Sequence, residues 1–168
     1  MQSLRERLIL LGATGAILSS AAFIGPTEEL RTTPYRDIGG VNTWCYGQTV
    51  GHAKARYTVQ ECDADLARTV AMYHKGVMLH MPQEAPESVQ AAFTSLAYNV
   101  GPRGWLDPRF LVPLREHRWE DACAAISAPW KGKHGVAKGF KATVAGKPVR
   151  GLENHRQKEA ELCRQDLP

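Results

Sequence analysis

The sequence has neither a Cys-x-x-Cys pair nor a His-x-x-x-His pair, two of the spacings that zinc sites commonly use. We therefore expect no metal. Its formal charge is +4, but the basic residues are scattered and do not gather with aromatic residues into a stripe, so we expect polyanions of a cell envelope as partners and no nucleic acid. The chain also contains no internal repeat and no low-complexity tract, which leaves one ordinary globular domain after the N-terminal segment.

Charged residues are absent from positions 8–27, LILLGATGAILSSAAFIGPT. A stretch of about 20 residues is long enough to cross a bilayer, but three glycines, four alanines and four hydroxyl residues make it a weak span. Arg5 and Arg7 precede it, which puts the N-terminus in the cytoplasm and exports the rest. We interpret residues 1–27 as a signal-anchor helix and 28–168 as the catalytic domain. A cleaved signal peptide, cut near Ala21 or Ala22, and a buried core helix are the alternatives.

The exported part predicts an α+β fold, in which a small hairpin precedes a helical lobe. A glycine-rich segment at 35–51 has β character. Thr58 and Glu61 form a capping box that starts a helix reaching about His80. Gly101 and Pro102 end a second helix. Shorter helices are expected at 108–116 and 117–127, a loop at 131–147 and a final helix at 151–164.

Four cysteines lie in the exported part. An even count outside the cytoplasm predicts two disulfides, with three possible connectivities. Because Cys45 and Cys62 flank a modest loop and Cys123 and Cys163 lie on two later helices, we favour the pairs Cys45–Cys62 and Cys123–Cys163.

Two acids and a threonine carry the chemistry. Glu28 is followed after eight residues by Asp37, and Asp37 after five by Thr43. Glycoside hydrolysis needs one protonated carboxyl group and one ionised carboxylate, and an acid at a helix end facing one in a turn would give the two groups different environments. Spacing alone is a weak signal and is more typical of a solvated surface pair.

The residues around these acids resemble the glycoside hydrolase family 24 lysozymes of bacteriophages and prophages. The resemblance rests on the pattern E-x-L/V-x-x-x-P-Y-x-D-x-x-G-V-x-T-x-x-Y-G from Glu28 and covers residues 28–163. Further matches follow in order: Tyr57-Thr58-x-x-Glu61-Cys62, Phe93-x-x-Leu96-x-Tyr98-Asn99-Val100-Gly101, Asp121-Ala122-Cys123 and Gly151-Leu152. The resemblance implies a lysozyme-like fold, a monomer, and a hydrolase without metal or organic cofactor.

By this resemblance, Glu28 is the general acid, Asp37 the second carboxylate and Thr43 the hydroxyl that helps hold water. An inverting mechanism is implied, with the carboxyl groups about 6.5–9.5 Å apart. Glu29 stands where the family usually has glycine and competes with Glu28 by position. His155 and Arg156 stand where relatives often have two arginines. If His155 faces the catalytic acid, activity would depend on pH near neutrality; a surface place for Arg156 is the plainer interpretation.

Weaker signals complete the candidate site. Tyr98 and Asn99 match residues that line the sugar cleft, with a core or cap role as the alternative. We expect the tryptophans in the core, at Trp44, Trp105, Trp119 and Trp130. We expect five histidines at the surface, namely His52, His74, His80, His117 and His134.

The sequence therefore predicts a signal-anchor-release endolysin, a muramidase that cleaves between N-acetylmuramic acid and N-acetylglucosamine in host peptidoglycan. It would lie first in the host inner membrane and later in the periplasm. A lytic transglycosylase, or a catalytically idle peptidoglycan-binding or membrane-disrupting module, is the alternative. We expect a membrane-bound segment to hold Glu28 away from Asp37 and Thr43, and release to let it pack on the domain.

Overall fold

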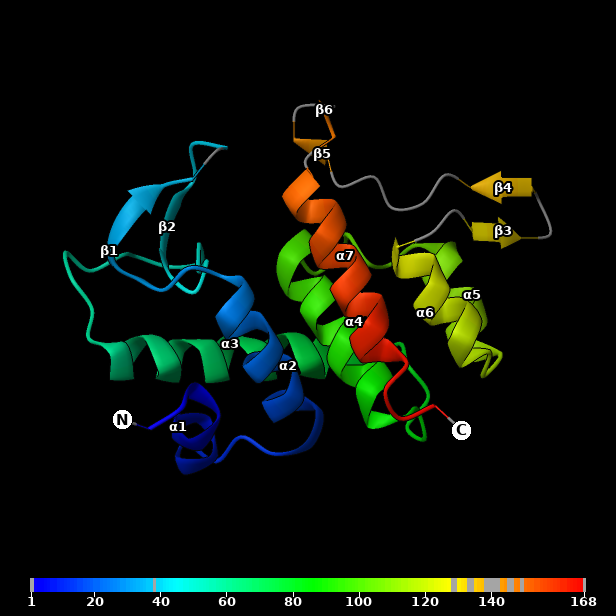
Figure 1. Cartoon of the computed structure of the whole chain (residues 1–168), viewed down its shortest axis with the longest axis horizontal. Coiled ribbons are helices and arrows are strands. Elements are labelled where there is room, and N and C mark those ends of the chain that lie inside the picture. Colours follow the sequence, from blue (N-terminus) through cyan, green and yellow to red (C-terminus); the bar gives the residue numbers. More distant parts are fainter. Residues whose placement is uncertain are drawn as a thin grey trace. The chain divides into compact units, whose positions relative to one another are not determined.

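The computed structural model describes residues 2–37, 39–127, 130–132, 135–137, 143–144, 147–148 and 150–167 (Figure 1). The chain divides into two compact units, Met1–Met72 and Tyr73–Pro168. The predicted α+β class is confirmed, since a small antiparallel hairpin precedes a mainly helical body.

Residues 4–27, which include the uncharged segment, form two helices in the first unit. Helix α1 spans Leu4–Leu10 and α2 spans Gly15–Thr27, with Gly12 at φ 84° in the break between them. Helix α1 begins with a capping box, in which Ser3 Oγ accepts from Glu6 N and Glu6 Oε2 accepts from Ser3 N. The sequence pattern that predicts such a cap, Ser-x-x-Glu, is present at Ser3 and Glu6, just before the apolar run. In the described part of the chain, no helix is long and apolar enough to span a membrane.

Strand β1, Arg31–Arg36, pairs antiparallel with β2, Asn42–Cys45. Tyr35 lies opposite Thr43, and the register shifts between Arg31 and Tyr35. A disulfide joins Cys45 at the end of β2 to Cys62 in helix α3, Val59–Met78, which is the pairing favoured from the sequence. The predicted capping box of α3 is confirmed, because Thr58 N donates to Glu61 Oε2 and Glu61 N to Thr58 Oγ1.

The core of the first unit includes both N-terminal helices. Leu8, Ala21 and Ile24 are fully buried, as are Leu66 and Val70 of α3. Each buried Leu or Ile side chain stabilises the fold by about 1.5–3 kcal/mol. In this structure residues 4–27 are therefore an integral part of the folded unit. This arrangement agrees with the alternative in which the N-terminal segment is a buried core helix.

The second unit is built mainly from helices (Figure 1). Helix α7, Arg150–Cys163, packs on α4, Glu87–Val100, and on α6, Trp119–Ser127, while α5, Pro108–Arg115, packs on α6. Phe93, Trp105 and Phe110 form an edge-to-face aromatic cluster in its core. Gly101 ends α4 at φ 82° as predicted. The second disulfide joins Cys123 and Cys163, again the favoured pair.

Two expectations for this unit need correction. The loop expected at 131–147 contains two short hairpins, β3 Trp130–Gly132 with β4 Gly135–Ala137, and β5 Thr143–Val144 with β6 Lys147–Pro148. Their strands have two or three residues, too few to show an alternating pattern. His134 and the side chain of Trp130 fall outside the described residues.

Not every expected histidine lies at the surface. His74 is half-buried beside Thr94 Oγ1, and burial lowers its pKa; His80 packs edge-on against Trp105. His117 lies 3.6 Å from Glu84 and is exposed, as is His52. The core placement is right for Trp44 and Trp105, whereas Trp119 is half-buried.

Candidate active site

Glu28 caps the C-terminal end of α2, where its N–H donates to Ile24 O at 2.9 Å. The side chain is partly buried and its carboxyl group lies against the turn after β2. A Cβ placed on Gly47 would be 3.2 Å from Glu28 Oε2. Gly47 also has φ 83°, a conformation that glycine adopts without strain. This turn can therefore approach the carboxyl group closely because residue 47 has no side chain.

Glu29, the positional competitor, has a different environment. Its carboxylate is exposed and pairs with Arg31, at 2.7 Å from Nη2. It thus resembles an ordinary surface acid in a high dielectric. Burial and bonding partners therefore distinguish the two neighbouring glutamates. The sequence offered only the number of residues between each glutamate and Asp37, and that number says nothing about burial or partners.

Asp37 follows β1 and organises the turn that leads to β2. Its Oδ1 accepts from the N–H groups of Gly39 and Val41, both at 2.8 Å, and its own N–H donates to Val41 O at 3.0 Å. Among the described residues, no hydrogen bond or ion pair reaches Oδ2. Asp37 thus has one oxygen fixed by backbone amides and a second that can accept from a water molecule.

Thr43 lies on β2, almost completely buried, and its Oγ1 donates to Val41 O at 3.1 Å. Val41 therefore contacts both candidate residues, with its N–H on Asp37 and its C=O on Thr43. One short stretch of backbone fixes the two side chains relative to each other. The disulfide at Cys45, two residues on, attaches this strand to α3.

Tyr35 belongs to the same site, although sequence reasoning did not select it. Tyr35 pairs with Thr43 across the hairpin, and the Arg31 guanidinium lies 4.4 Å from the centroid of its ring. Burial raises the pKa of Tyr35 most; Arg31 opposes that shift, while the negative charges of Glu28, Asp37 and Glu29 add to it. Both candidate carboxylates therefore act electrostatically on one ring, so the first unit brings them into a common region. The Pro34-Tyr35 pair of the sequence pattern was the available signal.

The remaining candidates lie in the second unit. Tyr98 and Asn99 are half-buried at the end of α4, with Tyr98 edge-on to Tyr73 and Asn99 Nδ2 donating to Ser95 O at 3.2 Å. Asn99 Nδ2 also lies 3.2 Å from His155 Nε2. These contacts give both side chains fixed positions within the unit, while a role toward a sugar stays a prediction.

A buried acid explains the residues around His155. Glu159 is fully buried and accepts from Ser95 Oγ at 2.6 Å. His155 Nε2 lies 3.1 Å from its Oε1, and Arg156 Nη1 lies 2.7 Å from its Oε2. The expected surface place for Arg156 is wrong, because this arginine is 3% exposed. It is buried since the buried carboxylate of Glu159 needs a nearby cation.

Within the described part of the chain, no group of three His, Cys, Asp or Glu side chains could hold a metal ion.

Comparison with known proteins gives a consistent result. The sequence model of the phage lysozyme family matches residues 26–159. The chain is 28% identical to the SAR-endolysin of Enterobacteria phage P21, over 96% of this chain and 95% of that protein. It is 30% identical to the SAR-endolysin of Pseudomonas phage phiKMV, over 89% of each.

Solved structures show the same fold. The crystal structure of the active form of P1 phage endolysin Lyz superimposes with a TM-score of 0.73 at 24% identity, covering 100% of this chain and 97% of that one. The endolysin from Escherichia coli O157:H7 phage FAHEc1 superimposes with a TM-score of 0.72 at 22% identity, over 89% and 92%.

Proposed function

Since the chain belongs to the phage lysozyme family, and is thus a peptidoglycan-degrading glycoside hydrolase of the endolysin type, we propose that it cleaves the β-1,4 bond between N-acetylmuramic acid and N-acetylglucosamine. Host cell lysis follows from loss of the glycan strands. Lysozyme chemistry needs an acid for the leaving oxygen and a carboxylate for the attacking group, and the first unit contains candidates for both.

In this proposal, Glu28 protonates the departing glycosidic oxygen. Asp37 accepts, through Oδ2, a proton from a water molecule that the Thr43 hydroxyl helps to orient, and the water attacks the anomeric carbon from the opposite face. Two backbone N–H groups hold the other carboxylate oxygen of Asp37 in place. The configuration at the anomeric carbon would invert, and we expect the carboxyl groups to stand about 6.5–9.5 Å apart in a crystal structure.

The observation that supports these roles best is the difference between neighbouring glutamates. Glu28 lies against the turn at Gly47 and acts with Asp37 on Tyr35, whereas Glu29 is an exposed partner of Arg31. A general acid benefits from a partly desolvated place, because desolvation favours its protonated form. Of these two neighbouring glutamates, Glu28 is the one that is partly buried.

A lytic transglycosylase acting on the same bond is the second candidate. That reaction closes the muramic acid on its own hydroxyl and needs no bound water. The pairing of Asp37 and Thr43 around Val41 favours hydrolysis, because both side chains can hold a water molecule. Product analysis separates the two reactions, since hydrolysis gives a reducing muramic acid end and transglycosylation an anhydro end.

We further propose that residues 1–27 act first as a signal anchor in the host inner membrane and afterwards as part of the periplasmic enzyme. Three observations support this proposal: residues 8–27 carry no charge, several relatives are named SAR-endolysins, and Leu8, Ala21 and Ile24 are buried in the folded unit. Cleavage after Ala21 would remove both Leu8 and Ala21 from the core, so we expect release of the uncut chain.

The catalytic assignment is tested with Glu28→Gln and its matched control Glu29→Gln, two isosteric changes at adjacent positions. We expect Glu28→Gln to lower kcat on purified peptidoglycan by about 1,000-fold, the range of general acid catalysis, and Glu29→Gln to leave it within about twofold of wild type, as for an exposed ion pair. Full activity of Glu28→Gln would reject the assignment of Glu28 as the general acid.

A further inference from the structure

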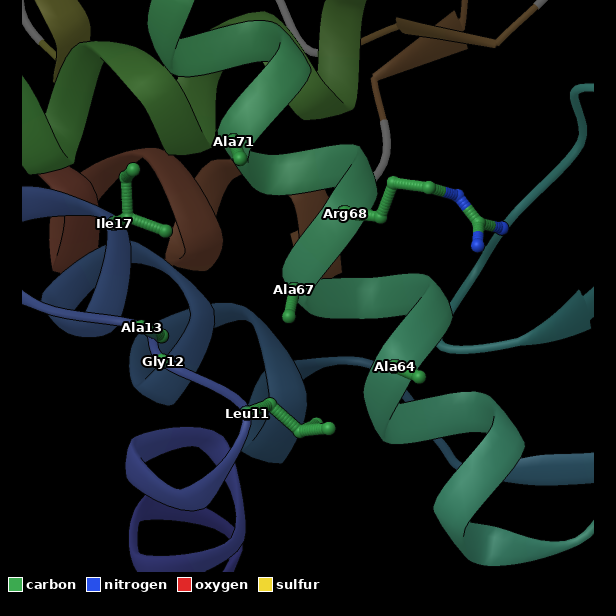
Figure 2. A pocket seen from close by; sticks show the side chains of 8 residues that line it. All are labelled: Leu11, Gly12, Ala13, Ile17, Ala64, Ala67, Arg68 and Ala71. Carbon is green, nitrogen blue, oxygen red and sulfur yellow. The ribbon is translucent and has the colours of Figure 1, made fainter.

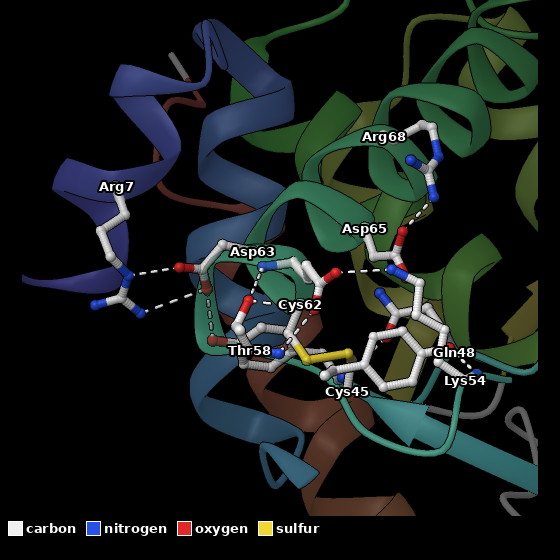
Figure 3. The surroundings of a disulfide bond; sticks show 12 residues. Arg7, Cys45, Gln48, Lys54, Thr58, Cys62, Asp63, Asp65 and Arg68 are labelled. Atoms are coloured by element: carbon white, nitrogen blue, oxygen red, sulfur yellow. Dashed lines mark hydrogen bonds and ion pairs between the residues drawn. A yellow bond between two sulfur atoms is a disulfide. The ribbon is translucent and has the colours of Figure 1, made fainter. Parts of the chain in front are cut away.

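Helix α1 carries an ion pair whose partner lies 56 residues away in the chain. Arg7 Nε lies 2.5 Å from Asp63 Oδ2, and Nη2 lies 3.4 Å from Oδ1 (Figure 3). The hydroxyl of Tyr46 donates to Asp63 Oδ1 at 2.8 Å. Arg7 Nη1 also donates to Gln2 O at 2.7 Å. The guanidinium thus attaches the first turn of the chain to α3.

Asp63 depends on this arginine. Its side chain is 1% exposed, and a buried carboxylate is strongly unfavourable unless a cation and hydrogen-bond donors compensate it. The hydrogen bond to Asp63 is the main reason that the pKa of Arg7 is raised. Burial, and then the bond to Asp63, raises the pKa of Tyr46 to about 12, so Tyr46 stays a neutral donor. Arg7 is therefore the cation for this acid.

The same helix supports the end of α2 that leads to Glu28. A Cβ placed on Gly25 would overlap Leu4 Cδ2, so Leu4 packs directly on the helix backbone there. Gly25 lies in the last turn of α2, which Glu28 caps. When α1 is in place, it therefore limits the positions open to this turn and to the carboxyl group beyond it.

Asp63 is tied in turn to the opposite side of the site. It follows Cys62, which is bonded to Cys45 at the end of β2 (Figure 3). Its other partner, Tyr46, precedes Gly47, the residue that the Glu28 carboxyl group approaches. The pair between Arg7 and Asp63 thus connects the helix behind Glu28 to the turn in front of it.

Elsewhere the N-terminal segment packs incompletely on α3. A pocket of about 290 Å³ lies between residues 11–17 and the small side chains on one side of α3 (Figure 2). The apolar residues Ile9, Leu10 and Leu11 are all exposed, each by about half or more. Because the apolar contacts leave this region partly open, α1 is attached to the rest of the unit by the ion pair, the buried Leu8 and the contact of Leu4 with Gly25.

We propose that Arg7 is a positioning residue, which holds α1 through Asp63 and thereby holds the Glu28 carboxyl group at Gly47. The inference rests on the proposed function, in which Glu28 is the acid. It also gives the anchor a consequence. While residues 8–27 span a bilayer, Arg7 and Asp63 lie on opposite sides of it, so the pair forms only after the segment leaves the membrane. In the anchored protein, the positive charge of Arg7 helps to keep the N-terminus in the cytoplasm. In the released protein, the same residue pairs with Asp63.

The test compares Arg7→Met with Arg5→Met in the purified, released full-length protein. Arg5 lies on the same helix, is exposed and forms no ion pair with any described residue, so both variants lose one positive charge at the N-terminus. We expect Arg7→Met to lower kcat on wall fragments by about 10- to 100-fold, the effect of a misplaced catalytic group. KM should stay unchanged, because Arg7 contacts no substrate. Arg5→Met should match wild type. Equal effects of the two variants would overturn the proposal.

Two further measurements separate positioning from loss of the fold. Arg7→Lys keeps the charge but offers one point of contact in place of the planar fork, so its kcat should lie between those of wild type and Arg7→Met at an unchanged melting temperature. Hydrogen exchange at residues 4–10 should speed up in Arg7→Met while the amides of α3 stay protected. Slow exchange in α1 together with low kcat would contradict the proposal.

A double-mutant cycle with Asp63→Asn tests the pair itself. Arg7→Met leaves a buried charge without its cation, whereas the double variant removes both charges, so the stability losses should be strongly non-additive. Additive losses would show that the two residues do not interact. Glu28→Gln is assayed in parallel: if it retains activity, the proposed function fails, whereas the exchange and stability results still decide whether Arg7 docks α1.

Discussion

The two sides of the candidate site are held in different ways. The hairpin that carries Asp37 and Thr43 is fixed by backbone hydrogen bonds and by a disulfide to α3. The helices that lead to Glu28 are held by apolar packing and one ion pair. A covalent link fixes the side that carries Asp37 and Thr43 permanently, whereas the side that carries Glu28 is attached by contacts that can form or be lost. This difference agrees with the proposal that Glu28, the proposed acid, reaches the site only after the N-terminal segment has left the membrane.

The strongest test of this difference between the two sides removes the disulfide between Cys45 and Cys62. Cys45→Ala with Cys62→Ala should lower the free energy of unfolding by about 3 kcal/mol, from the loss of one loop constraint, and should lower kcat because Thr43 lies two residues from Cys45. Chemical denaturation and wall-clearing rates measure both effects.

The second disulfide provides the control. Cys123→Ala with Cys163→Ala should cost about 4 kcal/mol, because its loop is longer, but should leave kcat unchanged at temperatures where the variant is folded. If both double variants lost kcat equally, the hairpin disulfide would have no special relation to the site.

The packed side is tested at Gly25. Gly25→Ala places a methyl group into Leu4, and such overpacking costs about 1–3 kcal/mol; we also expect a lower kcat because the last turn of α2 must shift. Gly76→Ala is the matched control on α3, where nothing lies within 4 Å of the new Cβ. There the helix should gain up to about 1 kcal/mol. Thermal unfolding of the two variants should shift in opposite directions.

The smallest expected effect concerns the contact between the Glu28 carboxyl group and the turn at Gly47. Gly47 and Gly51 both have positive φ, 83° and 107°, so alanine is strained at each, by about 1–2 kcal/mol. Only at Gly47 does the new methyl group approach Glu28, at 3.2 Å from Oε2. We expect similar losses of stability, but a several-fold lower kcat for Gly47→Ala alone. Equal kcat values would mean that Glu28 does not work from this position.

Much of the fold followed from local signals. Capping residues and helix-ending glycines predicted α3 and α4 because these signals act within a few residues of the chain. The interruption of the N-terminal segment was missed, since an uncharged run looks continuous although Gly12 takes a left-handed conformation. The short hairpins after α6 were missed as well, because their strands are too brief for a periodic pattern.

The site was predictable only in part. The spacing of Glu28, Asp37 and Thr43 could be read from the sequence, and the structure describes all three in one unit. The partners that fix them could not be read, because Arg7 with Asp63 and Glu28 with Gly47 are separated by many residues and follow no periodic rule. The buried place of Arg156 was missed for the same reason: its position depends on Glu159 being inside the fold.

The central claim is that Glu28 reaches its working position only when the N-terminal segment is folded onto the first unit. The most direct measurement compares equal amounts of the full-length protein, either inserted in lipid vesicles with the domain outside or released from them, on soluble wall fragments that need no access to a cell. We predict cleavage by the released form and little or none by the inserted form. Equal rates for the two forms would contradict the account.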